Sequence, residues 1–311
     1  MSVAVCATVK NEVADARALI EGLLSQRFPA DEIVIVDGGS TDGTLDTLRA
    51  CAAIDSRIVV RSAPGTNIAA GRNLAIKSTR AALVAVTDAG IQRSPFWLEG
   101  LVAALDSEPL AAGSFGYILA SPSTTFEAAL GAVVLPLAHE IDEKKYPPSS
   151  GSALFRRSWI DRIGGYPEWL AHGEDLWLDR AIWRAGGWFC HASEADVGIR
   201  PRSTVSAFAR QYFQYAAGDG HAGMLVHRHI VRFGAYGLGV VLFSLPSAVA
   251  KVLLGVLVCG YLWRVLRRAP VMIQRTASAK PILAVVLMPI LRIVGDVSKM
   301  AGFVAGYCRR L

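Results

Sequence analysis

The stretch Val84-Ala85-Val86-Thr87-Asp88-Ala89-Gly90 decides the fold that this sequence predicts. It is the end of an apolar run from Ala81, typical of a parallel-sheet strand covered by helices on both faces. The run stops on a carboxylate and a glycine. Because ligands in open α/β sheets bind beyond the carboxyl ends of the strands, Asp88 is a candidate binding residue. The alternative is that Asp88 caps a helix starting near Ser94-Pro95.

Strand and helix patterns alternate on both sides of this stretch. We predict strands over 3–8, 32–36, 58–61, 83–87, 113–119 and 149–155, and helices over 15–25, 44–53, 68–79, 96–105 and 124–139. Alternation of this kind before residue 90 indicates right-handed βαβ units. The sequence therefore predicts an α/β fold with a mostly parallel central sheet.

Charge is divided unevenly between the two ends of the chain. The net charge is +6, yet residues 1–226 hold 20 Lys/Arg against 25 Asp/Glu, and residues 227–311 hold 12 against Asp296 alone. In the C-terminal part the basic residues alternate with long apolar runs, which favours anionic lipid headgroups as partners. No nucleic-acid-binding signature accompanies them, so we expect no nucleic acid partner.

The C-terminal part is predicted to be a membrane segment. Residues 236–263 are apolar except for Lys251, and residues 281–307 carry Arg292, Asp296 and Lys299 at helical spacing, as in an amphipathic or re-entrant helix. Basic flanks on both sides favour a hairpin hinged at Pro246 to Lys251. We therefore divide the chain into a domain at 1–226, expected to fold without the tail, and a membrane-associated helical segment at 227–311.

The cell compartment is indicated by the cysteines and the N-terminus. Five dispersed cysteines without a CxxC pair fit a reducing environment. The chain begins directly with a strand pattern and shows no signal peptide. We expect a cell-membrane protein whose catalytic domain lies on the cytoplasmic side.

A glycine-rich turn, Asp37-Gly38-Gly39-Ser40-Thr41-Asp42-Gly43-Thr44, follows the second predicted strand. It is neither GxGxxG nor a P-loop, which disfavours a plain dinucleotide or NTPase site. Glycines there permit close approach of a ligand. Asp37 stands at the strand end, where its carboxylate can accept hydrogen bonds from a nucleobase or a ribose hydroxyl.

Together, Lys10-Asn11-Glu12, residues 32–44, Gly71-Arg72-Asn73-Leu74-Ala75 and Thr87-Asp88-Ala89-Gly90 resemble family 2 glycosyltransferases of the GT-A fold. The resemblance covers residues 1–225. It implies an enzyme that uses a nucleotide-sugar donor. The donor-binding residues that it implies are Thr8, Asn11, Glu12, Asp37, Gly38, Arg72 and Asp88.

The resemblance also implies a metal site. Asp88 takes the first position of the family's DxD element, whose carboxylates reach Mg²⁺ or Mn²⁺. Ala89 and Gly90 stand where the later carboxylate would lie, which argues against a complete metal site. Arg200, Arg202 and Arg210 are candidates to neutralise the diphosphate instead. Surface pairing of these arginines is the alternative.

A second carboxylate pair, Glu174-Asp175, opens a predicted helix. Its alternative role is to complement the helix dipole. By the resemblance it is the acceptor-site motif, and inverting transfer needs one base to take the proton of the attacking hydroxyl. Asp175 is the candidate base and Glu174 its positioning neighbour. His172 and His191 are weaker candidates.

The sequence thus predicts an inverting glycosyltransferase that acts on a lipid-linked or polysaccharide acceptor at the membrane. The rival hypothesis is a non-catalytic, membrane-bound nucleotide-sugar sensor or assembly subunit that kept the fold. Gly90 in place of a carboxylate motivates the rival.

Overall fold

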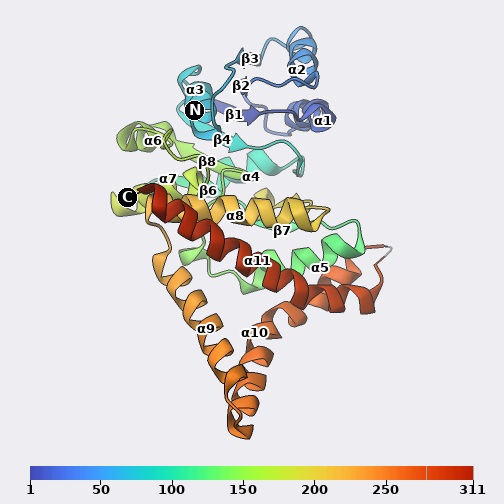
Figure 1. The fold of residues 1–311 in the computed structure, drawn as a ribbon. Coiled ribbons are helices and arrows are strands. Elements are labelled where there is room, and N and C mark those ends of the chain that lie inside the picture. Colours follow the sequence, from blue (N-terminus) through green and yellow to red (C-terminus); the bar gives the residue numbers. More distant parts are fainter. Residues whose placement is uncertain (278, 311) are drawn as a thin grey trace. The chain divides into compact units, whose positions relative to one another are not determined.

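The computed structural model describes residues 1–277 and 279–310 and divides into two compact units (Figure 1). The first unit comprises residues 1–119 and 138–199, and the second comprises residues 120–137 and 200 to the C-terminus. The second unit includes residues 120–137 and 200–225, which lie inside the predicted domain at 1–226. The division of the chain at residue 226 stays a prediction.

The first unit holds the strands and the helices that position the site. Its strands are β1 (Val3–Val9), β2 (Glu32–Asp37), β3 (Ile58–Ser62), β4 (Leu83–Thr87), β5 (Ile91–Gln92), β6 (Gly113–Phe115), β7 (Ile118–Ala120), β8 (Ser152–Arg156), β9 (Phe189–His191) and β10 (Val197–Ile199). Its helices are α1 (Val13–Leu24), α2 (Thr44–Ala52), α3 (Ile68–Lys77), α4 (Trp97–Ser107), α6 (Arg157–Ile163) and α7 (Glu174–Arg184), with short 3₁₀ turns η1 (Ala138–Glu140), η2 (Glu143–Lys145) and η3 (Ser193–Ala195).

The main sheet has seven strands in the order β3-β2-β1-β4-β8-β6-β9. β1, β2, β3 and β4 are parallel, and β9 is parallel to β6, whereas β8 is antiparallel to both of its neighbours. The mostly parallel α/β prediction is confirmed. Because β2 and β4 flank β1 in parallel, Asp37 and Asp88 both follow carboxyl ends at the same edge of the sheet.

The core on one face of this sheet explains why the apolar runs are strands. Alternate side chains of β1, β2, β4 and β8 pack with α3, α6 and α7 in one buried cluster. β4 is buried along its whole length, as expected for a central parallel strand. The fold therefore holds the carboxyl ends of the strands on a rigid layer.

The strand predicted over 113–119 is wrong in one respect: it forms two short strands in different sheets. β6 pairs with β8 and β9, while β7 joins β5 and β10. Gly116 lies between them, and a Cβ there would come within 1.7 Å of the Ala195 carbonyl oxygen. Only glycine permits this close crossing, and an apolar run does not reveal it.

The second unit consists of helices: α5 (Thr125–Val134), α8 (Val205–Ala222), α9 (Val226–Ser244), α10 (Ala248–Gln274) and α11 (Pro281–Arg310). α5 is shorter than the helix predicted over 124–139, because Pro136 has no N–H to donate. α11 packs closely on α8. A Cβ on Gly302 or Gly306 would lie 2.1 or 1.9 Å from a carbonyl oxygen of α8.

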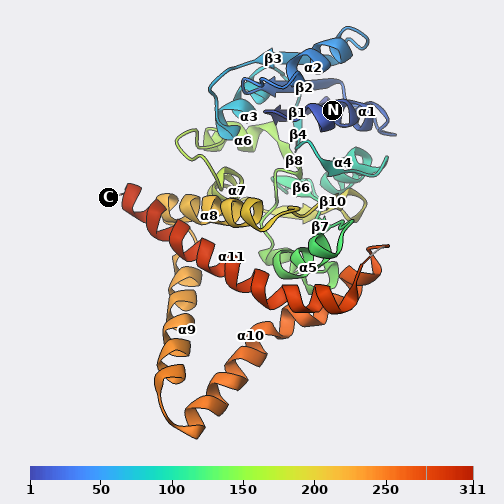
Figure 2. The same cartoon turned by 45° about the vertical axis from the view of Figure 1, so that its right-hand side comes forward.

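The apolar tail begins with the predicted helical hairpin (Figure 2). α9 and α10 run antiparallel from a turn at residues 245–247. Lys251, the only charge in this run, donates to the Phe243 carbonyl at the end of α9. By length and composition α10 and α11 could each cross a membrane. α11 buries one face, including Leu291 and Phe303, which agrees with an amphipathic helix.

Candidate functional site

The last residue of β2, Asp37, presents a buried carboxylate with one oxygen that has no partner among the described residues. Asp37 is 1% exposed, and its Oδ2 accepts the N–H groups of Gly39 at 3.0 Å and Ser40 at 3.1 Å. Its Oδ1 is buried and has no partner among the described residues. An unsatisfied buried acceptor costs free energy, so a ligand N–H or O–H would fit there. Gly38 follows Asp37, and a Cβ added there would lie 3.4 Å from the Thr66 carbonyl oxygen, so a side chain at this position would have little room.

Asn11 and Glu12 hold the β1–α1 loop against the β2–α2 loop. Asn11 has φ +55°, donates its N–H to the Ser40 hydroxyl at 2.9 Å and accepts the Thr41 N–H at 2.9 Å. The N–H of Glu12 donates to the Thr44 hydroxyl at 2.9 Å. These contacts shape the loop pair around Asp37. Whether the two side chains also touch a donor stays a prediction.

Arg72 joins the two carboxylate motifs. This buried residue of α3 donates from Nη2 to Asp88 Oδ1 and from Nη1 to Glu174 Oε1, both at 2.7 Å. Although burial opposes it, the carboxylates of Asp88, Glu174 and Asp175 raise the pKa of Arg72. The structure therefore brings together residues that lie 16 and 102 positions apart from Arg72.

The first turn of α7 concentrates negative charge. Burial raises the pKa of Glu174 to about 7, with Arg72 opposing and Asp175 adding to the shift. Burial also raises the pKa of Asp175, opposed by Arg72 and increased by Asp88. One turn later, burial and Asp175 hold the pKa of Asp179 well above its usual range. Burial and the neighbouring carboxylates outweigh the guanidinium of Arg72, so each of these carboxyl groups retains its proton more strongly than a free carboxyl group.

Arg93 was missed by the sequence interpretation. It donates from Nη1 to the Thr87 hydroxyl at 2.9 Å and to the Asp88 carbonyl oxygen at 3.2 Å. Burial lowers its pKa to about 10, against the influence of Asp88. An arginine six residues after the end of β4 is typical of a surface position, and no local pattern indicates that its side chain folds back onto Asp88. With Arg72 it places two guanidinium groups at Asp88.

A divalent cation has an incomplete set of ligands here. No group of three His, Cys, Asp or Glu suited to a metal occurs within residues 1–277 and 279–310. Gly90 has φ +72°, and a Cβ there would lie 3.5 Å from Asp15 Oδ2. Asp15 on α1 therefore approaches the position where the second DxD carboxylate is missing. Mg²⁺ needs only one or two protein carboxylates when phosphates supply the other ligands. On that criterion Asp88 is one candidate ligand, and Asp15 beside Gly90 is a candidate second ligand.

The three candidate diphosphate arginines lie in the second unit. Arg200 Nε is 3.1 Å from both carboxylate oxygens of buried Glu127, and Arg202 Nε is 3.4 Å from Gln211 Oε1. Arg210 is exposed on α8. Arg200 thus has the pairing that we gave as the alternative. A role at the diphosphate stays a prediction for all three.

His172 and His191, the weaker candidates for the base, have surroundings that differ from those of Asp175. Burial lowers the pKa of His172, which favours its neutral form. His191 stacks on Tyr117 with ring centroids 3.8 Å apart, and its Nε2 lies 2.8 Å from Asp196. His191 is therefore a member of an aromatic cluster.

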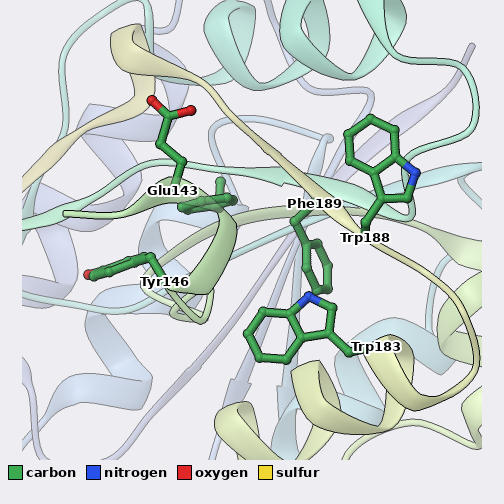
Figure 3. Close-up of a pocket in the computed structure, with 6 residues that line it drawn as sticks. Glu143, Tyr146, Trp183, Trp188 and Phe189 are labelled. Carbon is green, nitrogen blue, oxygen red and sulfur yellow. The ribbon is translucent and has the colours of Figure 1, made fainter.

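An aromatic cavity of about 160 Å³ lies beside this cluster. Figure 3 shows Glu143 and Tyr146 on one side and Trp183, Trp188 and Phe189 on the other. Burial, together with the charges of Asp196 and Asp175, raises the pKa of Tyr146. A cavity of roughly 150 Å³ accepts one six-membered ring. Aromatic faces around a rim carboxylate suit a ring that has both an apolar face and hydroxyl groups.

Sheet order and the loop carboxylates define a GT-A nucleotide-sugar transferase fold. The family model described as "Glycosyl transferase family 2" matches residues 4–164, and the chain belongs to this family. Succinoglycan biosynthesis protein ExoA of Rhizobium meliloti (strain 1021) is 27% identical over 267 residues, which are 81% of this chain and 77% of the relative. Glycosyltransferase AglE of Haloferax volcanii is 23% identical over 251 residues, 79% and 82% of the two chains.

Solved structures show the same fold. Mannosyltransferase PcManGT from Pyrobaculum calidifontis, in complex with GDP-Man and Mn²⁺, superposes with a TM-score of 0.55 at 17% identity, covering 98% of this chain and 86% of that one. S. aureus TarS 1-349, in complex with UDP-GlcNAc, gives 0.53 at 14% identity, covering 98% and 91%. At these identities the likeness concerns the fold.

Proposed function

We propose that this glycosyltransferase moves a sugar from a nucleotide-sugar donor to a lipid-linked or polysaccharide acceptor, with inversion, at the cytoplasmic face of the membrane. The observation that carries the proposal is the bridge from Asp88 through Arg72 to Glu174. It couples the edge where a donor would bind to the turn that holds the candidate base.

Asp37 supports the donor part of the proposal. Its buried, unpartnered Oδ1 is suited to a base imide or a ribose hydroxyl. GDP-Man and UDP-GlcNAc accompany the two structural neighbours and illustrate donors of this class. Arg72 and Arg93 place positive charge at Asp88, where a leaving diphosphate would develop negative charge.

Asp175 supports the inverting step. A single displacement needs one base that takes the proton of the attacking hydroxyl, and a base works best when its pKa lies near the working pH. Burial raises the pKa of Asp175 in that direction, and it raises the pKa of the neighbouring Glu174 to about 7. The proton passes to a carboxylate oxygen of Asp175 as the acceptor oxygen attacks the anomeric carbon and the nucleoside diphosphate leaves. No covalent nucleophile is needed.

A divalent cation would be held by Asp88 and Asp15. When bound, it would supply positive charge to the diphosphate oxygens. Mn²⁺ is present with the mannosyltransferase neighbour. Arg72 at the Asp88 carboxylate and Arg93 at the Asp88 carbonyl oxygen provide positive charge at the same place without a metal.

The acceptor and the membrane are proposed from separate observations. The aromatic cavity beside Tyr146 suits one sugar ring of an acceptor. The exposed apolar hairpin suits insertion into a membrane, which would keep the enzyme with a lipid-linked acceptor. ExoA is named for the biosynthesis of a polysaccharide, which agrees with that class of acceptor.

The test is the variant Asp175→Asn in the full chain. We expect it to abolish transfer while nucleoside diphosphate affinity, measured by calorimetry, stays within about twofold, because the base acts on the acceptor. Asp179→Asn is the control variant, because it also removes a buried carboxylate from the same helix but not the candidate base. Near-normal transfer by Asp175→Asn would refute the assignment of the base. Donor binding without transfer or donor hydrolysis in the native protein would support the rival, a nucleotide-sugar sensor.

A further inference from the structure

We propose that the second unit contains a binding site for the phosphate headgroup of a lipid, lined by Arg264, Arg268 and Arg292. The inference rests on the proposed function only in that the hairpin inserts into a membrane. It requires no particular donor and no catalytic residue.

The site is a cavity of about 280 Å³ between α10 and α11. Arg264 and Arg268 stand one turn apart on α10, and Arg292 reaches the cavity from α11. Gly260, Tyr261 and Val265 complete the lining. Three guanidinium groups around one cavity can hold a phosphate by several charge-assisted hydrogen bonds, often in pairs.

Arginines outnumber acidic residues on the two helices that line this cavity. Asp296 is the acidic residue of α11, and its carboxylate already accepts from Arg232 Nε at 3.0 Å and from the Tyr261 hydroxyl at 2.7 Å. It also lies 3.6 Å from Arg292 Nε. One carboxylate is thus shared by two arginines. Within residues 1–277 and 279–310, Arg264 has no hydrogen-bond or ion-pair partner. Arg268 donates from Nη1 to the Ala132 carbonyl oxygen at 3.2 Å, so Arg264 is the guanidinium with which an anion would pair first.

Apolar surface next to the cavity identifies the anion as a lipid. Toward the hairpin turn, α10 exposes Val249, Val252 and Val256 by 64–68%, and Trp263, 63% exposed, directly precedes Arg264. The helix from Ala248 to Trp263 is roughly 24 Å long at 1.5 Å per residue. Aromatic residues mark the membrane interface, and basic pockets beside apolar helices suit phosphate headgroups.

The order of residues along α10 then agrees with one orientation. The apolar part enters the hydrocarbon, Trp263 lies at the interface, and Arg264 and Arg268 lie at the depth of the headgroups. A soluble phosphate would use the same guanidinium groups but would gain nothing from the hairpin. The combination favours a phosphate that carries an acyl or prenyl chain.

The experiment starts from the full-length protein solubilised in detergent micelles. It measures the fraction of the protein that transfers to vesicles. Phosphatidylcholine vesicles containing phosphatidic acid are compared with vesicles containing phosphatidylglycerol at equal surface charge. We expect the native protein to prefer the phosphate monoester. The double variant Arg264→Gln/Arg268→Gln should lose that preference by about tenfold. Arg309→Gln/Arg310→Gln removes the same charge elsewhere in the unit and should retain it.

Further arms separate the remaining explanations. The single variant Arg264→Gln removes no hydrogen bond or ion pair of the described residues, so a loss of preference with an unchanged circular dichroism spectrum would come from the headgroup contact. Asp175→Asn should bind the lipid as the native protein does, which separates this site from the proposed catalysis. Equal losses of lipid preference in both double variants would show that the total positive charge, and not this cavity, causes the preference. That result would overturn the proposed site. Displacement of the lipid by inorganic pyrophosphate or by a nucleoside diphosphate at equal concentration would overturn the assignment to a lipid.

Discussion

Arg72 is the residue on which the site depends most. It is 3% exposed and pairs with two carboxylates from different elements, so its loss leaves buried charges without a partner. We expect Arg72→Met to reduce the free energy of unfolding by about 3–5 kcal/mol at neutral pH. Urea denaturation would measure it, with exposed Arg61→Met as the control.

The same variant should respond to pH in a defined direction. Without the guanidinium, the pKa of Glu174 rises further above its unfolded value, so its ionisation costs stability. The deficit of Arg72→Met should therefore shrink toward pH 5 and grow toward pH 8, and Glu174→Gln should restore part of it. A deficit independent of pH would show that packing, and not charge, is what Arg72 contributes.

The carboxylates of α7 predict opposite pH trends for activity and stability in the native protein. The pKa of Glu174 is raised to about 7, and that of Asp175 is raised as well. Such groups favour folding when protonated, so their contribution to stability is present below the unfolded pKa near 4 and is lost as pH rises through the folded value. A base must be ionised, so kcat/KM should fall as pH decreases toward 5. Activity that stays flat to pH 5 would contradict this prediction.

Asp15 gives a prediction about the metal. If Asp15 supplies the carboxylate that Gly90 lacks, Asp15→Asn should weaken Mn²⁺ binding to the nucleotide-bound protein by about tenfold or more. Electron paramagnetic resonance of Mn²⁺ measures this without an activity assay. Asp46→Asn on the exposed side of α2 is the matched control. Equal Mn²⁺ affinity in both variants would exclude Asp15 as a ligand.

At the scale of elements, the close approach of α3 to β1 positions Arg72. A Cβ on Gly71 would lie 2.4 Å from the Thr8 hydroxyl, which itself lies 3.3 Å from the Val36 carbonyl oxygen. Gly71→Ala should push α3 outward and cost about 1–3 kcal/mol of stability, together with donor affinity.

Gly22→Ala is the control for this prediction, because a Cβ there meets nothing within 4 Å. It should stabilise α1 by about 0.5–1 kcal/mol, as alanine is the better helix residue. The double variant Thr8→Ala/Gly71→Ala removes the clashing hydroxyl and should recover part of the loss. If Gly71→Ala were as stable as Gly22→Ala, the close approach of α3 to β1 would not contribute to stability.

In the molecule as a whole, the tail is part of a folded unit that also contains earlier segments of the chain. α5 and α8 belong with α10 and α11 in one unit, and Phe208 of α8 and Met288 of α11 share one buried cluster. A chain that ends at residue 226 would expose that cluster. We therefore expect this shortened chain to aggregate. This expectation from the structure replaces the one from the sequence, that residues 1–226 fold without the tail.

Shortening the hairpin is the informative alternative. Replacing residues 237–256 by a short Gly-Ser turn removes exposed apolar side chains but retains the Tyr236–Tyr261 hydrogen bond of 2.9 Å. We expect a folded protein that binds donor normally and loses vesicle flotation and transfer to lipid acceptors. Circular dichroism, calorimetry and flotation would measure these. Unchanged flotation would contradict insertion of the hairpin.

Local sequence patterns were enough to predict the alternation of strands and helices up to β4, the hairpin in the tail, and the motifs at Asp37, Asp88 and Glu174-Asp175. These depend on local patterns: apolar periodicity, turn glycines and carboxylates placed at element ends. Parallel strands then bring such ends to one edge without further information. The roles of those residues in binding and transfer stay predictions.

Only the tertiary structure decided which side chains meet. It joined Arg72 to Asp88 and Glu174, brought Asp15 beside Gly90, folded Arg93 back onto Asp88 and split the strand at Gly116. It also grouped α5 and α8 with the tail and gathered Arg264, Arg268 and Arg292 around one cavity. Each of these depends on contacts between distant segments, and local periodicity carries no information about such contacts because the residues that enforce them lie elsewhere in the chain.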